Sequence, residues 1–166
     1  MAVYNQNEID DLIECPKNIF EAPKRAMKLV GADWRNDMRL VSCDEPILDF
    51  SVFMRKNEDF PENFSVGLKY HPKDDRGEII LLRCNGPHGG YNASFDPDHP
   101  HWAYHVHRAD EKAIDAGLKA EKYARITTAY ASFEEALRYF VREINLNATD
   151  VSRYFPKLTL IDLALE

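Results

Sequence analysis

Residues 64–84 read FSVGLKYHPKDDRGEIILLRC, and this stretch decides the fold class. Phe64, Val66 and Leu68 occupy alternate positions, which is the period of a strand with one buried face. Residues 79–82 form a continuous aliphatic run, and the separator at residues 71–77 contains Pro, Asp and Gly. Two strand-like runs with such a short polar separator are typical of a hairpin. We predict that they pair antiparallel.

Similar runs flank this hairpin on both sides. Residues 38–42 and 47–54 precede it, and Asp44-Glu45-Pro46 separates the two runs. Residues 101–108 follow it after a loop rich in Gly, Pro and Asn. The spacing predicts an antiparallel meander of about five strands.

The clearest helix signal begins at Ser132, because Ser132 and Glu135 have the spacing of a capping box. The apolar residues that follow share one helical face: Phe133, Ala136, Leu137, Phe140, Val141 and Ile144. We expect this helix to end near Asn145, and shorter helices at residues 7–15 and 110–118. No repeat or linker interrupts the chain. The sequence therefore predicts a single α+β domain, residues 1–166, with the sheet packed against a C-terminal helix.

The end of the chain is unusually aliphatic. Five aliphatic residues fall within eight positions: Leu158, Leu160, Ile161, Leu163 and Leu165. Both a strand and a helix fit residues 151–166. Such a segment is covered either by its own domain or by another chain. We hypothesise that it completes the core and also serves a homodimer.

The composition bounds the function classes. The net charge of −7 and pI of about 5.4 argue against a protein that coats nucleic acid non-specifically, since that requires an excess of Lys and Arg. The three cysteines are far apart and form no Cys-x-x-Cys pair, which favours reduced thiols in a cytoplasm. No run approaches the roughly 18 apolar residues of a membrane span. We expect a cytoplasmic protein with no membrane association.

Five of the six histidines lie between residues 88 and 107: His88, His99, His101, His105 and His107. If residues 101–108 form a strand, successive side chains alternate between its two faces. His101, His105 and His107 then share one face with Ala103. The opposite face, with Trp102 and Tyr104, has the composition of a packing surface.

The preceding strand adds polar groups to the histidine face. Arg83 and Asn85 share a parity there, and Arg108 lies close although it starts on the other face. Imidazoles beside a guanidinium can cleave an RNA phosphodiester by general acid–base catalysis. We therefore expect His105 and His107 to act as acid and base, with His88 assisting. We expect Arg83, Asn85, Arg108 and His101 to bind the RNA substrate.

The same residues carry a resemblance. The elements are Arg83-Cys84-Asn85-Gly86-Pro87-His88, His99-Pro100-His101 and His105-Val106-His107. They resemble an uncharacterised bacterial domain family with Gly-Pro-His-Gly and His-Val-His-Arg elements. More distantly, they resemble the TumE-type toxins of toxin–antitoxin operons, in which a strand ending in Arg-Tyr-Asp-Asn leads into a His-rich stretch.

This resemblance covers about residues 79–146. It departs from the toxin pattern at Cys84 and Gly86, where the toxins have an aromatic residue and Asn, and in its longer loop. It implies a ribonuclease-like toxin with a cognate antitoxin as its protein partner.

Two other functions fit the sequence. A non-catalytic binding protein, such as an antitoxin, an immunity protein or a phage-encoded inhibitor, would use the acidic surface against a basic partner. A metal-binding domain would use His99-x-His101 and His105-x-His107 with Asp96 or Asp98. Because no carboxylate or thiol stands in a specific ligand motif, we expect no metal and no other cofactor.

Overall fold

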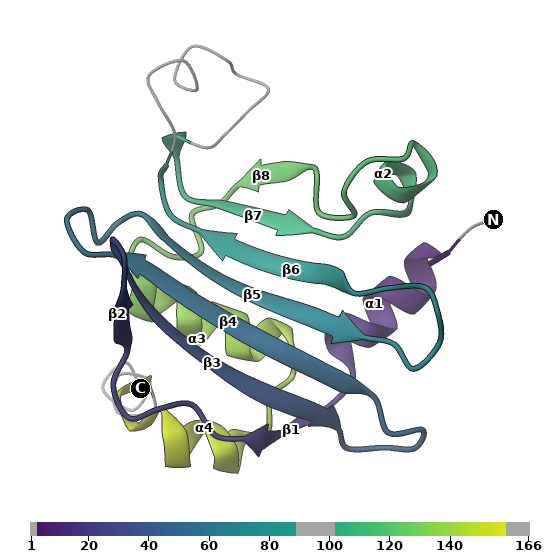
Figure 1. Cartoon of the computed structure of the whole chain (residues 1–166), viewed down its shortest axis with the longest axis horizontal. Coiled ribbons are helices and arrows are strands. Elements are labelled where there is room, and N and C mark those ends of the chain that lie inside the picture. The colour runs from purple at the N-terminus through teal and green to yellow at the C-terminus, as the bar shows by residue number, and fades with distance from the viewer. Residues whose placement is uncertain (1–2, 89–101, 159–166) are drawn as a thin grey trace.

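An antiparallel sheet forms the body of the molecule (Figure 1). The computed structural model describes residues 3–88 and 102–158, and within them the sheet has eight strands. These are β1 Lys17–Glu21, β2 Lys28–Val30, β3 Asp33–Ser42, β4 Asp49–Asn57, β5 Phe64–His71, β6 Ile79–Asn85, β7 His105–Arg108 and β8 Ala124–Ile126. Their order is β1-β3-β4-β5-β6-β7-β8, and β2 also pairs with β3.

The α+β class and the antiparallel pairing are confirmed, but the expected number of about five strands was too low. The five expected strands correspond to β3, β4, β5, β6 and β7. The additional strands β1, β2 and β8 are five, three and three residues long. All three residues of β2 are exposed, so this strand has no alternating apolar pattern by which the sequence could predict it.

One face of the sheet carries the core. Val66 of β5 pairs with Met54 of β4 and with Cys84 of β6, and all three side chains are buried. Helices α1 (Gln6–Glu14) and α3 (Phe133–Glu143) lie on the same side of the sheet (Figure 1). The core therefore has two helices over it. The expectation of a single C-terminal helix was too narrow, because α1 contributes Ile9, Leu12 and Ile13.

The helix termini follow from side-chain caps. Ser132 accepts a hydrogen bond from Glu135 N–H at 3.1 Å, so the predicted start of α3 is confirmed. Helix α1 starts after Asn5 rather than Asn7, because the Asn5 side chain accepts the hydrogen bond from Glu8 N–H. Two shorter helices are α2 (Glu111–Asp115) and α4 (Ala148–Tyr154).

The ends of α1 and α3 meet at one buried cation. Lys17 Nζ donates to the carbonyl oxygens of Ile13 at 2.7 Å, Cys15 at 2.9 Å and Ile144 at 2.9 Å. Its side chain is fully buried, and burial lowers the pKa of Lys17 to about 8. This lysine therefore satisfies carbonyls that the two helices leave without an internal partner.

Within residues 3–88 and 102–158, no helix is long and apolar enough to cross a membrane. Of the aliphatic tail, Leu158 is buried, which places the start of that segment in the core. Residues 159–166 lie outside the described part of the chain, so the proposed use of the tail in a homodimer remains a prediction.

Candidate functional site

The pairing of β6 with β7 brings four of the expected site residues together. Asn85 lies opposite His105, and Arg83 lies opposite His107. Their parity is opposite to that of Cys84, so they lie on the face of the sheet that α1 and α3 do not cover. We call this the open face.

Although α1 and α3 leave the open face uncovered, other segments of the chain bury its histidines. His105 is fully buried, His107 and Asn85 are almost so, and His88 is half-buried. Backbone carbonyls from neighbouring segments contact the two strand histidines: Ala103 O lies 2.7 Å from His105 Nδ1, and Glu121 O lies 2.8 Å from His107 Nδ1. The alternating pattern could not predict these loop contacts.

These carbonyls determine which ring nitrogen carries the proton. A carbonyl oxygen only accepts, so Nδ1 of His105 and Nδ1 of His107 must each be protonated. In the neutral ring, Nε2 then bears a lone pair and is the basic atom. Both imidazoles are thereby fixed in one tautomer and one orientation.

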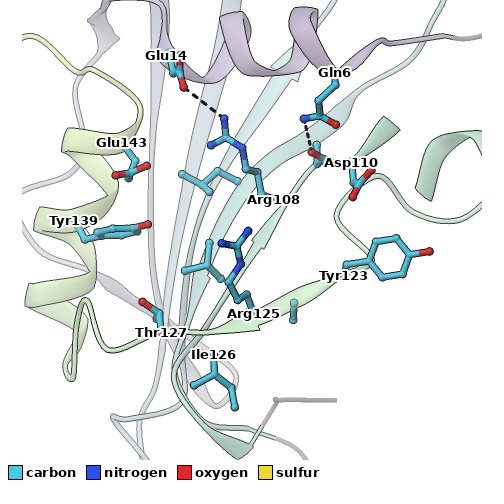
Figure 2. A pocket seen from close by; sticks show the side chains of 14 residues that line it. Gln6, Glu14, Arg108, Asp110, Tyr123, Arg125, Ile126, Thr127, Tyr139 and Glu143 are labelled. Carbon is cyan, nitrogen blue, oxygen red and sulfur yellow. Dashed lines mark hydrogen bonds and ion pairs between the residues drawn. The ribbon is translucent and has the colours of Figure 1, made fainter. Parts of the chain in front are cut away.

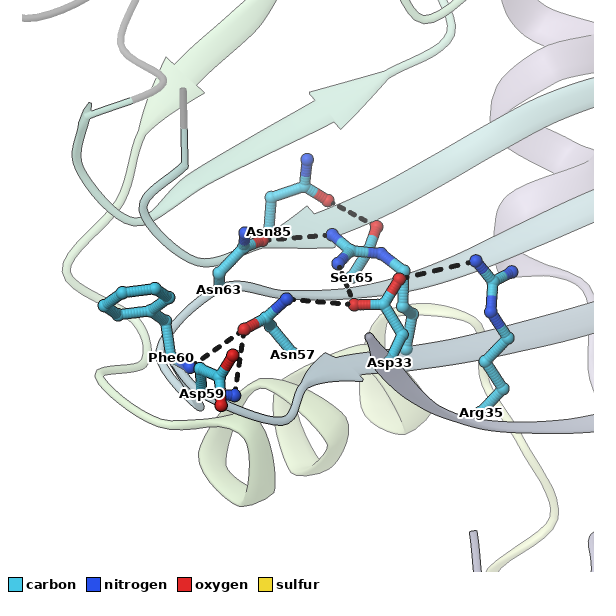
Figure 3. A network of polar contacts seen from close by, with 9 residues as sticks. Asp33, Arg35, Asn57, Asp59, Phe60, Asn63, Ser65 and Asn85 are labelled. Carbon is cyan, nitrogen blue, oxygen red and sulfur yellow. Dashed lines mark hydrogen bonds and ion pairs between the residues drawn. The ribbon is translucent and has the colours of Figure 1, made fainter. Parts of the chain in front are cut away.

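Three polar atoms form a compact triangle at the centre of the site. His88 Nε2 lies 3.2 Å from His105 Nε2, and the amide nitrogen of Asn85 lies 3.4 Å from each of them. On its other side, the Asn85 Oδ1 atom accepts a hydrogen bond from Ser65 Oγ at 2.7 Å (Figure 3). We call Asn85, His88 and His105 the triad.

Two residues hold the triad in place. A Cβ at Gly86 would overlap the carbonyl oxygen of Glu62, so only glycine allows this close approach of the loop that carries His88. From the helix side of the sheet, the buried Tyr130 hydroxyl lies 3.0 Å from Asn85 O and 2.7 Å from His105 O. Tyr130 thus ties β6 to β7 directly beneath the site.

Arg83 supplies a partly buried cation beside His107. Burial lowers the pKa of Arg83, the Glu121 carboxylate opposes this shift, and the nearby Arg55 cation adds to it. Among the described residues, no hydrogen-bond partner reaches the buried Arg83 Nε. A guanidinium with spare donors on the open face is suited to an anionic group.

A second polar network adjoins the triad through β5 (Figure 3). Arg55 Nη1 lies 3.2 Å from Asp33 Oδ1, and Arg55 Nη2 donates to Asn63 Oδ1 at 3.1 Å. Arg55 pairs across the strands with Ser65, and Ser65 pairs with Asn85. Ser65 and Arg55 were not among the residues expected at the site, although their parity in the two alternating strands assigns both to the open face.

Arg108 does not join the site, so its expected place there was wrong. Its side chain lies on the helix side and forms ion pairs with Asp10 at 3.0 Å and Glu14 at 3.6 Å. There it lines a cavity of about 570 Å³ between β7, β8, α1 and α3, with Arg125, Tyr139 and Glu143 (Figure 2). The reason is its parity: Arg108 pairs with Leu82, whose side chain belongs to the core.

Two further expectations concern the segment before β7. His101 lies outside the described residues, as do His99, Asp96 and Asp98. Trp102 was expected on a packing surface, but its side chain is 51% exposed. The strand begins only at His105, so alternation does not extend back to Trp102.

Comparison with protein families, with curated proteins and with solved structures finds no match to this chain. The resemblance to TumE-type toxins therefore stays a prediction, and the site is interpreted from its own geometry.

Proposed function

We propose that this chain is an endoribonuclease that cleaves RNA without a metal ion, by proton transfer at His88 and His105. The observation that carries this proposal is the distance of 3.2 Å between their Nε2 atoms, with the His105 tautomer held by Ala103 O. Imidazole is the side chain that most often transfers protons near neutral pH.

His88 is the half-buried member, and it contacts the substrate in our proposal. Its Nδ1 atom accepts the proton of an RNA 2′-hydroxyl, while its Nε2 proton passes to His105 Nε2. The 2′-oxygen then bonds to phosphorus, and the bond to the 5′-oxygen breaks. The pair returns the proton to that oxygen by the reverse route. The products are a 2′,3′-cyclic phosphate and a 5′-hydroxyl end.

The remaining expected residues have supporting roles. Arg83 stabilises the charge that develops on the phosphate oxygens. Asn85 orients the His105 imidazole, whose Nε2 lone pair faces the amide nitrogen. His107, whose ring centroid lies 5.1 Å from that of His105, positions the His105 ring. The sequence expectation was His105 and His107 as acid and base. His88 replaces His107 in the proposal because His88 Nε2 lies 3.2 Å from His105 Nε2 and because His88 is the half-buried histidine of the triad.

The test is cleavage of a single-stranded RNA in the presence of a chelator. We expect the parent protein to give 2′,3′-cyclic phosphate ends, and His88→Ala and His105→Ala to lose at least about a hundredfold in rate. His71→Ala is the matched control, because His71 contacts Ser51 and Glu78 away from the triad. If the pure parent does not cleave RNA, or if both variants keep its rate, the proposal fails.

A second candidate is a non-catalytic binding protein, such as an antitoxin or an inhibitor. The burial of His105 and His107 favours it, since buried imidazoles also serve as structural hydrogen-bond donors, and the net charge of −7 suits a basic partner. For the ribonuclease we propose a cognate antitoxin as partner and the cytoplasm as location. Co-purification with a neighbouring gene product, without RNA cleavage, would favour the binding protein.

A further inference from the structure

We infer that the triad is a binding site for a divalent transition-metal ion of the zinc class. The three edges of the triangle are 3.2, 3.4 and 3.4 Å. Zn²⁺ binds imidazole nitrogen at about 2.0–2.1 Å, so the donors of a tetrahedral ion lie about 3.3–3.4 Å from one another. An ion placed just above the plane of the triangle, over its centre, is therefore within bonding distance of all three corner atoms.

Both imidazoles bring an Nε2 atom within bonding distance of this point. His105 Nδ1–H donates to Ala103 O at 2.7 Å, which leaves the Nε2 lone pair as the ligand atom. A hydrogen bond from the outer ring nitrogen to a backbone carbonyl is the usual support of a metal-binding histidine. His88 Nε2 meets the same point from the adjoining loop.

The third corner is the amide of Asn85. Its nitrogen faces the imidazoles, and its oxygen accepts from Ser65 Oγ. The two amide atoms exchange places when the group turns over, and the Ser65 hydroxyl can accept from the nitrogen as well as donate to the oxygen. In the turned orientation, Asn85 Oδ1 faces the ion, and no hydrogen bond to Ser65 is lost.

The available donor atoms determine which residues can bind the ion and which metals they suit. In residues 3–88 and 102–158, no three His, Cys, Asp or Glu side chains gather to hold a metal, and in our inference the Asn85 amide oxygen is the third ligand. Two imidazoles and one oxygen suit Zn²⁺, Co²⁺ or Ni²⁺ better than Ca²⁺ or Mg²⁺, which take oxygen ligands. Three protein donors leave the fourth position of a tetrahedral ion for water.

The site bears on the proposed function but does not depend on it. An ion bound to His88 Nε2 and His105 Nε2 occupies the lone pairs between which the proton would move. Zinc binding therefore inhibits the proposed ribonuclease reversibly. Binding itself is measurable on the folded protein whether or not it cleaves RNA.

The experiment is calorimetric titration of the chelator-treated full chain with ZnCl₂, followed by Co²⁺ as a spectroscopic probe. We expect one ion per chain and visible absorption typical of tetrahedral Co²⁺. His88→Ala should weaken binding by at least about tenfold. Asn85→Asp should strengthen it by about tenfold, because a carboxylate replaces a neutral oxygen at the same position. His71→Ala should bind as the parent does.

Because Asn85 and His105 are buried, the folding of each variant is checked by circular dichroism, and the half-buried His88 carries the decisive comparison. Absence of zinc binding by the folded parent overturns the inference. So does unchanged binding by His88→Ala, or binding that disappears only in a His99→Ala, His101→Ala double variant. Metal-free cleavage of RNA tests the proposed function separately. Cleavage that requires zinc would reject both the metal independence of the proposed ribonuclease and its inhibition by zinc.

Discussion

The phenol of Tyr130 donates to the carbonyl oxygen of His105 over 2.7 Å, from the side of the sheet opposite to the His105 imidazole. The same hydroxyl lies 3.0 Å from Asn85 O, so one buried group bridges the two strands that carry the triad. Position and orientation of the site thus depend on a residue that never reaches the open face.

Tyr130→Phe should lower the free energy of unfolding by about 1–3 kcal/mol, because two buried carbonyls lose a shared donor. Zinc affinity should fall with it, since β6 and β7 lose the hydroxyl bridge beneath the triad and keep only their backbone pairing. Urea denaturation and calorimetry measure the two effects. Tyr139→Phe is the control, and a Tyr130→Phe protein as stable as the parent would contradict this role.

Gly86→Ala tests the close approach of the His88 loop to Glu62. The added Cβ meets backbone rather than a flexible side chain, so the loop must move, at a cost of about 1–3 kcal/mol. Zinc binding and RNA cleavage should both fall, because His88 moves with the loop. Gly31→Ala controls for backbone strain alone: Gly31 has φ of 65° and no atom near the position of a Cβ. Equal effects of the two substitutions on the site would reject the explanation.

Lys17→Met should destabilise the protein, since carbonyls of Ile13, Cys15 and Ile144 lose their donor at a typical cost of about 1–3 kcal/mol. The size of the effect should depend on pH. The pKa of Lys17 is lowered from 10.5 to about 8 on folding. Between these values the unfolded chain holds the proton and the folded chain does not, so stability from this group rises with pH.

Urea denaturation at about pH 7 and about pH 9.5 measures this dependence. The difference in unfolding free energy between parent and Lys17→Met should be larger at the higher pH. Lys24→Met, at an exposed lysine, should show no such change. A difference that shrinks as pH rises would mean that burial does not lower this pKa.

Arg83→Gln and Arg108→Gln separate the two faces of the sheet. Arg83→Gln should reduce RNA cleavage about a hundredfold, because Arg83 lies beside the proposed reaction centre. Arg108→Gln should leave the cleavage rate unchanged and cost only about 0.2–1 kcal/mol of stability, because its ion pairs with Asp10 and Glu14 are partly exposed. Loss of cleavage in Arg108→Gln alone would restore the role expected from the sequence.

Trp102→Ala should change the unfolding free energy by no more than about 0.5 kcal/mol, because the ring is 51% exposed. Phe140→Ala, on the face of α3 that packs into the core, should cost about 3–5 kcal/mol. Thermal denaturation distinguishes the two. A large loss in Trp102→Ala would show that this indole is covered in solution.

The sequence predicted the central strands because their alternation reflects a real difference between two faces. In β4, Phe50, Val52 and Met54 are buried at every second position, as the pattern indicated. Strands β2 and β8 carry no such signal. Neither strand has a buried face, so apolar residues do not recur at every second position. Their positions follow from tertiary pairing, which local pattern does not contain.

The sequence predicted which residues belong to the candidate site better than it predicted their contacts. Parity correctly placed Asn85 and His105 on one face, and the proximity of the two strands follows once they pair. The contacts of the two strand histidines with Ala103 O and Glu121 O did not follow, because these carbonyls belong to loops whose course no periodicity describes. Ser65 carries no chemical signal in the sequence, because a single Ser between Phe64 and Val66 is an ordinary polar position of an alternating strand.

The contact of Lys17 Nζ with Ile144 O joins positions that are 127 residues apart in the chain. During synthesis, the first strand leaves the ribosome long before α3 does. Until Ile144 has emerged, the ammonium group lacks one of its acceptors, and the apolar face of the sheet lacks the helix that covers it. The nascent chain therefore cannot complete this fold strand by strand, and its closure waits until α3 has left the ribosome.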